Sequence, residues 1–407
     1  MSDNVNFVPV LLGSDINAYS MARAFHEEYG IQSVMVARDR AGVTGAGLTN
    51  LFIYVENKKL DEKEEFLKTM KEVMDKFGTS KQLLLIGCAD HYVRLIVENK
   101  EGLIQTGFIV PYSDKSVLDN ITLKESFYYL CDKYNVEFPT TFIYKPWMNF
   151  ELDYSFPYPM VVKASDSVAY HKYKFEGFQK AYFVNNKDEL IRTLRLIYSN
   201  GYDGNMILQE MIPGPDSNEY DLQMYIGSDH KAKLLNLGNV LLEEHTPTAI
   251  GNNAATMTVY DENLMNTVAH MLEVIGYEGF ADADIKLDPR DGVYKIFEIN
   301  IRQGRSNYRV TGGGHNLAKL VVDDYIYHKK LDKVLVNEPY FWHVVPIGLV
   351  YTFVKDKKKV AQVRKLVEAG KVCCSTSYSE DMPFKRWIYL KLRALNFYKK
   401  FLRYYPR

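Results

Sequence analysis

Oxygen-bearing side chains recur along one short segment at a spacing that suits a metal ion. Residues 282–288 read DADIKLD, and because side chains alternate along a strand, the three aspartates share one face with Lys286. Glu298 and Asn300 share a face of the next predicted strand. If the two strands form a hairpin with that face beside Asp284, two carboxylates and an amide oxygen converge, which suits Mg²⁺ bound together with substrate phosphates. A charged solvent-exposed face is the less favoured alternative, because Lys286 alone cannot balance the acids.

Three arginines follow this acidic hairpin, at Arg302, Arg305 and Arg309. They could neutralise the carboxylates, or hold a phosphoryl group or a substrate carboxylate through paired N–H donors, and both roles are compatible. The glycines at 312–314 precede a predicted helix, where free amides would attract an anion. A flexible joint is an equally good interpretation of these glycines.

Upstream of the hairpin, two lysines and the segment after one strand have the chemistry to bind a nucleotide. Lys163 ends the apolar strand 160–162, where a buried ammonium needs an anionic partner, either a nucleotide phosphate or an internal carboxylate. Lys124 opens the predicted amphipathic helix 123–134. The segment 209–214 would place an exposed backbone edge just after a strand, which is useful for binding an adenine ring.

Composition limits the class of protein. The 407 residues suffice for two or three compact units, and 47% hydrophobic with 25% charged residues is typical of a soluble globular chain. With 50 basic and 51 acidic residues the net charge is −1, so no nucleic-acid partner is expected. There are four cysteines without a Cys-x-x-Cys pair, no signal-like amino terminus and no long apolar run. These features predict a reduced, cytoplasmic environment.

The order of elements predicts a mixed α/β architecture. Strands at 7–12, 33–37 and 82–86 alternate with helical patterns, which indicates a parallel sheet. Two prolines and several aromatic residues at 137–147 mark the connection into a new unit, in which antiparallel strands predominate up to residue 299.

These features together resemble the ATP-grasp superfamily. The resemblance rests on the strand-ending Lys163, the segment 209–214, the strand around Asp284 and the ending EINIR at 298–302. The Asn-x-Arg-x-x-Arg-Ser ending is similar to carbamoyl-phosphate synthetase large chains and, more loosely, to biotin carboxylase. A closer resemblance, over about residues 7–330, is to the D-aspartate ligase group of bacterial carboxylate–amine ligases. It includes the segments LLGSDINAYSMARAFHEEYG, LLEEHTPTAIGNNAAT and FEINIRQGRSNYRVTGGG.

The resemblance implies an α/β and α+β fold in three parts. A pre-ATP-grasp domain with a parallel sheet is expected at 1–115. A two-lobed ATP-grasp fold is expected at 116–330, with lobes at about 116–205 and 206–330. A C-terminal segment with a basic amphipathic helix follows at 331–407.

The resemblance also implies roles for individual residues. ATP would contact the nucleotide-binding residues Lys124, Lys163, Glu210, Ile212 and Glu219. Magnesium, or manganese in its place, would be held by Asp284, Glu298 and Asn300. The catalytic groups would be Arg302, Arg305 and Lys163, and the phosphate or acceptor would approach Glu243, His245, Gly251, Asn252 and Arg309. The family's glycine-rich phosphate loop falls at 165–172, where SDSVAYHK contains no glycine, so its phosphate contacts are left open.

The activity implied is ATP-dependent amide formation through an acyl phosphate. An amino acid donates the carboxylate and an amine accepts it, and the resemblance to the D-aspartate ligase group suggests D-aspartate and the lysine amine of a peptidoglycan precursor. One alternative is a ligase of the same mechanism that joins another amino acid or peptide. A second alternative is a nucleotide-binding module at the membrane that has lost catalysis.

The C-terminal segment 383–407 contains eight basic residues and no acidic one. On a helix, apolar and aromatic residues fall on one side: Trp387, Leu390, Ala394, Tyr398, Phe401, Leu402 and Tyr405. The basic residues that fall mostly opposite are Arg393, Lys399, Lys400 and Arg403. This pattern fits either a terminal helix docked on its own protein or peripheral contact with the inner face of the cell membrane.

Overall fold

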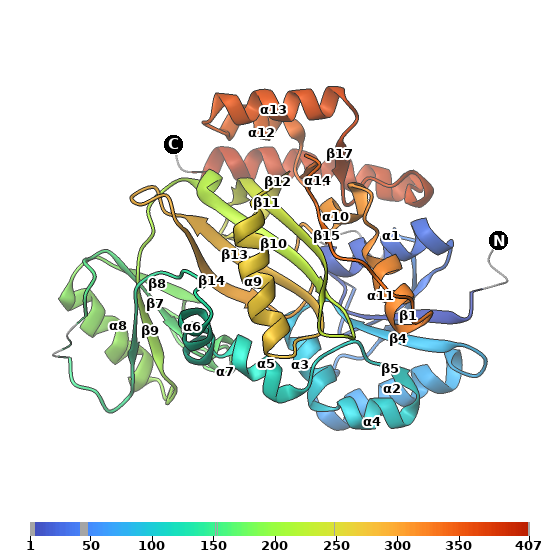
Figure 1. Cartoon of the computed structure of the whole chain (residues 1–407), viewed down its shortest axis with the longest axis horizontal. Helices are drawn as coiled ribbons and strands as arrows, with labels where there is room; N and C mark the ends of the chain where they lie inside the picture. Colours follow the sequence, from blue (N-terminus) through green and yellow to red (C-terminus); the bar gives the residue numbers. More distant parts are fainter. Residues whose placement is uncertain (1–4, 41–47, 151, 153, 248, 406–407) are drawn as a thin grey trace.

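The computed structural model describes residues 5–40, 48–150, 152, 154–247 and 249–405. Both chain ends and Thr248, which lies in one of the segments that carry the resemblance, fall outside these residues. Figure 1 shows a large sheet in the centre, a small sheet with its helices on the left, and a parallel sheet on the right. The predicted α/β and α+β fold class is confirmed.

The N-terminal unit is built on the predicted parallel sheet, whose strand order is β3-β2-β1-β4-β5. Its strands are β1 (Phe7–Leu12), β2 (Ser33–Ala37), β3 (Phe52–Glu56), β4 (Gln82–Gly87) and β5 (Phe108–Ile109). Its helices are α1 (Ile16–Tyr29), α2 (Lys63–Phe77), α3 (Asp90–Glu98) and α4 (Lys100–Thr106). Two of the loops that follow strands, after β1 and β4, lead into α1 and α3. Open α/β sheets bind ligands at the carboxyl ends of their strands, where these loops lie.

The helices α5 (Lys115–Thr122) and α6 (Lys124–Lys133) lead into a four-stranded antiparallel sheet of order β6-β9-β7-β8. Its strands are β6 (Thr141–Tyr144), β7 (Met160–Ala164), β8 (Ala181–Val184) and β9 (Met206–Glu210). The accompanying helices are α7 (Ser167–Tyr170) and α8 (Lys187–Ser199). A buried cluster formed by residues between 144 and 208 gives this small lobe a core of its own.

The large sheet has the order β14-β13-β10-β11-β12-β16-β17, with β15 paired to β11. Its first five strands in the chain are β10 (Glu219–Ile226), β11 (Ala232–Glu244), β12 (Asn252–Val259), β13 (Gly279–Leu287) and β14 (Tyr294–Asn300). The C-terminal strands are β15 (Val334–Leu335), β16 (Phe341–His343) and β17 (Val372–Cys374). Other elements here are the 3-10 turn η4 (Asp216–Asn218) and the helices α9 (Glu262–Val274), α10 (Tyr308–Gly312) and α11 (Leu317–Tyr325).

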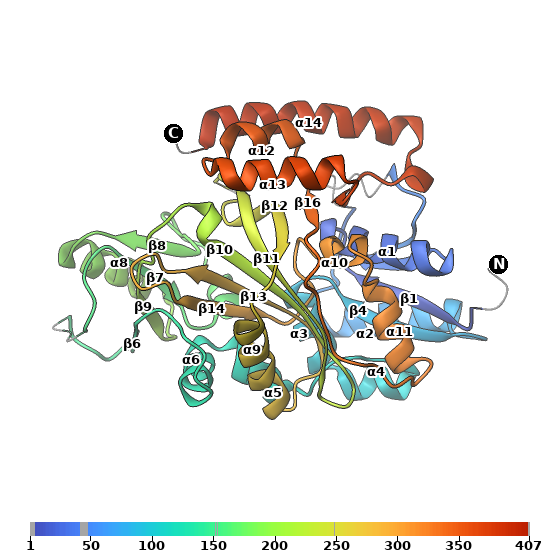
Figure 2. The same cartoon turned by 45° about the horizontal axis from the view of Figure 1, so that its top comes forward.

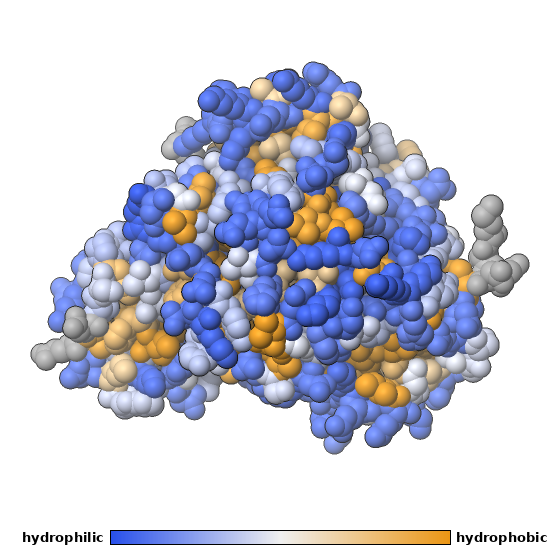
Figure 3. All heavy atoms as spheres, viewed as in Figure 1, coloured by the Kyte–Doolittle hydropathy of each residue, from blue (hydrophilic) through white to orange (hydrophobic). Residues whose placement is uncertain are grey.

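The large sheet and the N-terminal unit share their hydrophobic cores. One cluster joins Val10 and Leu85 of the parallel sheet to Leu222 and Ala283 of the large sheet. Interdigitated apolar side chains resist sliding, so we expect these two units to move as one body. Most buried apolar residues of the small lobe form a cluster of their own, although Ile207 of β9 packs into the shared core, so we expect the small lobe to be the part that moves against them. On the face shown in Figure 3, hydrophobic side chains form small patches separated by hydrophilic residues.

The C-terminal segment forms a helical layer against β12 and β16. It contains α12 (Ile347–Phe353), α13 (Lys357–Glu368), the 3-10 turn η5 (Ser379–Asp381) and α14 (Phe384–Tyr404). Figure 2 shows α14 running along the edge of the molecule beside α12 and α13. Phe397 and Phe401 of α14 are buried in a cluster with Trp342. Among the helices of the described residues, none combines the length and apolar character needed to cross a bilayer.

Candidate nucleotide and metal site

The three predicted metal ligands lie together on the hairpin formed by β13 and β14. Asp284 pairs with Glu298 and Asp282 with Asn300 in antiparallel register, followed by a bulge after Asp284. The side-chain amide of Asn300 donates to Asp284 Oδ2 at 3.2 Å. Burial and the charge of Glu298 raise the pKa of Asp284. Two carboxylates held this close favour a bound cation, and the oxygen-rich ligand set fits Mg²⁺.

Lysines from three segments surround Glu298. Lys124, at the start of α6, is buried and places Nζ 2.9 Å from Glu298 Oε2. The ammonium groups of Lys124, Lys180 and Lys163 hold the pKa of Glu298 well below its usual range. Lys163, near the end of β7, has its pKa lowered to about 8 by burial, with Lys180 acting in the same direction and Glu298 opposing it. A polyanion such as a triphosphate would satisfy these cations.

Arg302 connects the hairpin to the N-terminal unit. Its Nε lies 3.3 Å from Asp90 Oδ2 and its Nη1 3.4 Å from Asp282 Oδ2. Burial by itself would lower the pKa of Arg302, but the carboxylates of Asp90, Asp282 and Asp284 outweigh it and raise the pKa. A guanidinium beside the carboxylates of this hairpin can stabilise negative charge that develops on a transferring phosphoryl group.

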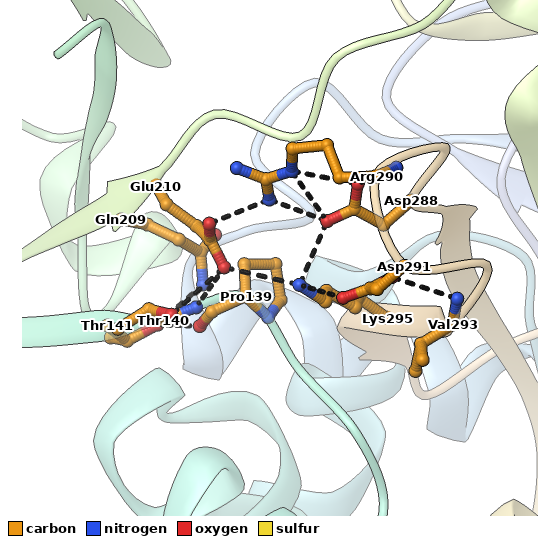
Figure 4. Close-up of polar contacts among 10 residues, drawn as sticks. All are labelled: Pro139, Thr140, Thr141, Gln209, Glu210, Asp288, Arg290, Asp291, Val293 and Lys295. Atoms are coloured by element: carbon orange, nitrogen blue, oxygen red, sulfur yellow. Dashed lines mark hydrogen bonds and ion pairs between the residues drawn. The ribbon is translucent and has the colours of Figure 1, made fainter. Parts of the chain in front are cut away.

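Glu210, at the end of β9, uses its carboxylate in an internal network (Figure 4). It accepts hydrogen bonds from the backbone N–H of Thr140 at 2.8 Å and from Arg290 Nη2 at 2.7 Å, and Lys295 Nζ lies 3.5 Å away. These donors lower the pKa of Glu210 against the effect of its burial. Arg290 and Lys295 also bind Asp288, so the network links the small lobe to the turn between β13 and β14.

The connection from β9 to β10 carries the other two predicted nucleotide-binding residues. Ile212 is buried. Glu219, the first residue of β10, lies opposite Lys286 in register, and its Oε1 is 2.6 Å from Lys286 Nζ. Burial raises the pKa of Glu219, and Lys286 opposes that shift. Asp288, predicted on the same strand face as the metal ligands, belongs instead to the network around Glu210.

Arg305 lies further from the hairpin, against the ends of β11 and β12. Its guanidinium pairs with Glu244, and Nε donates to the backbone carbonyl of Asn253 at 3.0 Å. Asn252, predicted as a substrate residue, is the register partner of Glu244. The structure therefore brings Arg305 and Asn252 to one edge of the site.

His245 faces a second acidic group near the same edge. Its Nε2 lies 3.0 Å from Asp216 Oδ2, and its ring meets that of Tyr405 edge-on. Glu243 also belongs to this group, and burial together with Glu219 and Asp216 raises its pKa to about 8. Gly251 is the last residue of the turn before β12 and has φ at +79°.

Arg309 lies behind the hairpin that carries the predicted metal ligands, because its ion-pair partner Asp221 is the register partner of Asp284. It is fully buried, with Nη1 2.8 Å from Asp221 Oδ1 and Nε donating to Asn236 Oδ1 at 2.8 Å. The guanidinium lies over Gly238, where a Cβ would come within 2.0 Å of it. With internal partners on each side, Arg309 has the environment of a structural ion pair.

The glycine-free segment 165–172 forms the short helix α7 instead of an open glycine loop. Asp166 accepts the backbone N–H of Ala169 at 3.0 Å and lies 3.5 Å from Arg94 Nη1. The cation that this part of the small lobe adds to the site is Lys180. Lys180 precedes Ala181, the register partner of Lys163.

Two important residues were not predicted from the sequence. Lys180 lies in an irregular segment without periodicity, so only the pairing of β7 with β8 reveals its place beside Lys163. Asp90 had a usable signal, because it follows the carboxyl end of a parallel strand, β4, where α/β sheets place ligand-binding groups.

The paired carboxylates, the surrounding lysines and the two-lobed architecture define a nucleotide-binding fold of the ATP-grasp type. Solved structures of other enzymes share this fold. The chain aligns with a Staphylococcus aureus N5-carboxyaminoimidazole synthetase complexed with ADP at a TM-score of 0.59 and 11% identity, covering 89% of this chain and 88% of that chain. It aligns with the biotin carboxylase domain of Hydrogenobacter thermophilus 2-oxoglutarate carboxylase, in complex with MgADP, ADP and bicarbonate, at a TM-score of 0.59 and 15% identity, covering 82% and 74%. At these identities the comparisons establish the fold.

A sequence relative then identifies the family. The chain is 36% identical over 417 aligned positions to the D-aspartate ligase of Enterococcus faecium (strain Aus0004), covering 99% of this chain and 98% of the relative. No protein-family model matches the chain. The chain belongs to the D-aspartate ligase family, and the predicted class, a C–N bond-forming ligase with the ATP-grasp fold, is confirmed.

Proposed function

We propose that this protein uses ATP and Mg²⁺ to join the side-chain carboxyl of D-aspartate to the lysine side-chain amine of a peptidoglycan precursor. The observation that carries the proposal is the Asp284–Glu298 pair, which faces Lys124 and Lys163 across the lobes. Support for ATP and Mg²⁺ comes from this oxygen-ligand set and from the nucleotide complexes of proteins with the same fold.

Charge explains why the reaction needs this site. A carboxylate oxygen that attacks the γ-phosphorus approaches another anion, and two unit charges about 4 Å apart repel by roughly 4 kcal/mol at an effective dielectric constant near 20. Lys124, Lys163 and Arg302 offset this repulsion as ADP leaves. Asp284, Glu298 and Asn300 would hold Mg²⁺, which supplies further charge neutralisation on the phosphates.

The second step forms the amide. The acceptor amine attacks the acyl carbon, phosphate departs and the amine loses a proton. Closure of the small lobe would keep water from the acyl phosphate. The network of Glu210, Arg290 and Lys295 is placed to set the lobe angle, since it joins β9 to the turn after β13.

The test of this function is release of phosphate from ATP and Mg²⁺ across a panel of D- and L-amino acids and amine acceptors. We expect turnover to require D-aspartate and a lysine amine. Turnover with another donor would favour a ligase of the same mechanism with different specificity. No phosphate release with any donor would favour a nucleotide-binding module without catalysis and would refute the ligase.

A substitution at Glu298 tests the assignment of the metal ligands. Glu298→Gln removes one ligand charge and is expected to abolish turnover, whereas the exposed Glu368→Gln on α13 is expected to match the parent. The thermal unfolding midpoint of each variant checks the fold. Activity of Glu298→Gln within a few-fold of the parent would mean that the metal ligands lie elsewhere.

We propose domains at 1–115, 116–330 and 331–407, as the sequence predicts. Within the middle domain, a lobe boundary after Glu210 fits the structure better than one at 205/206. The reason is that β9 pairs with β6 and β7 of the small sheet. Limited proteolysis with and without ATP would locate the boundary. It should lie at the connection between the lobes whose cleavage ATP slows most.

We also propose that the protein works in the cytoplasm at the inner face of the membrane, through the outer side of α14. This helix buries Phe397 and Phe401 but exposes large apolar side chains on its other side: Phe384, Ile388, Leu392, Leu395 and Leu402. Exposed basic residues flank them: Lys385, Lys391, Lys399 and Arg403. Within the apolar stripe predicted from the sequence, Phe401 is docked on the protein, whereas Trp387, Tyr398 and Leu402 are exposed. The other four exposed apolar residues were not part of that predicted stripe. Apolar side chains bordered by cations suit an anionic lipid surface.

Deletion of the tail is a poor test of membrane binding, because it would also uncover the core around Phe397. The double substitution Leu392→Glu and Leu395→Glu keeps that core and is expected to abolish binding to phosphatidylglycerol vesicles. Ile104→Glu on α4, also an exposed apolar residue, is the matched control. Unchanged vesicle binding of the double variant would refute membrane contact through α14.

A further inference from the structure

A cavity of about 300 Å³ lies between the inner side of α14 and the end of β11. Its lining consists of one residue from β11 and five from α14: Glu244, Tyr389, Arg393, Asn396, Phe397 and Lys400. The five helix residues recur at spacings that place them on one face of the helix, turned away from the exposed apolar side. The helix thus presents a polar, cation-bearing face to the body of the enzyme.

The cations of this cavity exceed its anions. Arg393 and Lys400 flank the ring of Phe397, at 5.0 and 5.7 Å from its centroid. Within the described part of the chain, neither has an ion-pair partner closer than 4.0 Å. The carboxylate of Glu244 is already paired with Arg305. Burial lowers the pKa of Arg393, the charge of Arg305 lowers it further, and Tyr389 and Glu244 oppose that shift. Half-buried guanidinium and ammonium groups that share one carboxylate, itself paired with Arg305, suit an anionic ligand.

The cavity is connected to the metal site through two arginines. Glu244, in the cavity wall, binds Arg305, and Arg302, three residues earlier in the chain, binds Asp282 on the hairpin. A ligand in the cavity would therefore lie at the end of the site that Arg305 borders. The lysines expected to bind ATP, Lys124 and Lys163, surround Glu298 instead. The cavity is thus suited to a substrate other than the nucleotide.

We propose that this cavity binds an anionic group, a carboxylate or a phosphate, of the amine acceptor through Arg393 and Lys400. The inference rests on the proposed ligase function and extends it, because it assigns acceptor recognition to the C-terminal helix. The acceptor amine would then point past Arg305 toward the acyl phosphate. The same helix would serve two surfaces, its inner face for the acceptor and its outer face for lipid.

The test separates acceptor binding from acyl phosphate formation. Hydroxylamine traps an acyl phosphate as a hydroxamate without any acceptor, so its rate reports on ATP and donor alone. We expect Arg393→Gln and Lys400→Gln to form hydroxamate at the parental rate. With a lysine-containing peptide acceptor, we expect KM for the acceptor to rise roughly ten- to a hundredfold, as loss of a hydrogen bond between charged groups predicts. KM for ATP should stay unchanged.

Controls distinguish a binding role from a structural one. Lys365→Gln, on the exposed side of α13, should leave all constants unchanged. Arg393→Lys keeps the charge and should recover part of the acceptor affinity. If KM for the acceptor changes less than twofold in both glutamine variants while hydroxamate and product form normally, the inference is overturned. Absence of hydroxamate in the parent would instead overturn the proposed function, and this inference with it.

Two further measurements identify the anion. Amidation of the acceptor's terminal carboxyl should raise KM in the parent but not in Arg393→Gln if the cavity binds the carboxylate. Inorganic pyrophosphate should compete with the acceptor in the parent but not in Arg393→Gln if the cavity binds phosphate. Failure of both measurements to depend on Arg393 would overturn the assignment of an anion to this cavity.

Discussion

Lys163 is expected to reduce the stability of the protein when no nucleotide is bound. Its folded pKa of about 8, against 10.5 for an ordinary lysine, means that the charged form is disfavoured by roughly 3 kcal/mol in the folded state. Methionine has a similar length and no charge. Lys163→Met should therefore stabilise the unliganded protein at pH 7 by up to about 3 kcal/mol while abolishing ATP turnover. If the chain unfolds as one unit, the unfolding midpoint should rise by about 3–4 °C.

The dependence of folding stability on pH tests whether Lys163 destabilises the protein. Below pH 8, Lys163 is charged in both states and the full cost is present. Between pH 8 and 10.5 the unfolded chain binds a proton that the folded protein does not, so parental stability rises with pH. The advantage of Lys163→Met should thus shrink toward pH 10.5. Thermal unfolding with EDTA and without nucleotide, at pH 7 and pH 10, measures it. A variant less stable than the parent at pH 7, or an advantage independent of pH, would refute the reasoning.

Two other substitutions test the structural assignments. Arg309→Met leaves Asp221 as a buried unpaired charge and should destabilise the protein by about 3–5 kcal/mol, whereas the exposed Arg364→Met should not. An Arg309→Met protein that unfolds like the parent but loses acceptor affinity would make Arg309 a substrate residue after all. Arg290→Ala removes one of the two cations beside the buried Asp288 and should destabilise the protein by about 1–3 kcal/mol, and it should raise KM for ATP several-fold by releasing Glu210. Unchanged KM for ATP would show that the network does not set the lobe angle.

Local pattern sufficed for much of the fold. Alternation along residues 282–288 predicted the strand that carries Asp284, and apolar runs ended by polar residues predicted β1, β7 and β9. These predictions succeed because strand alternation depends on neighbours in the chain. β3, Phe52–Glu56, was not among the predicted strands, although its run FIYVE consists largely of strand-forming residues.

The amino-acid sequence alone determined the residue types of the site, namely the carboxylates, lysines and arginines, and the family resemblance that ordered them. Tertiary structure decided which of these charges meet. Lys124 and Glu298 are 174 residues apart in the chain and 2.9 Å apart in space, whereas Arg309, only four residues after Arg305, is buried in the core. Electrostatic partnership depends on distance and burial, and both are set by the packing of sheets against one another. For the same reason the helix α14 could be predicted from its sequence, whereas the division of its surface into docked, cavity-lining and exposed faces could not.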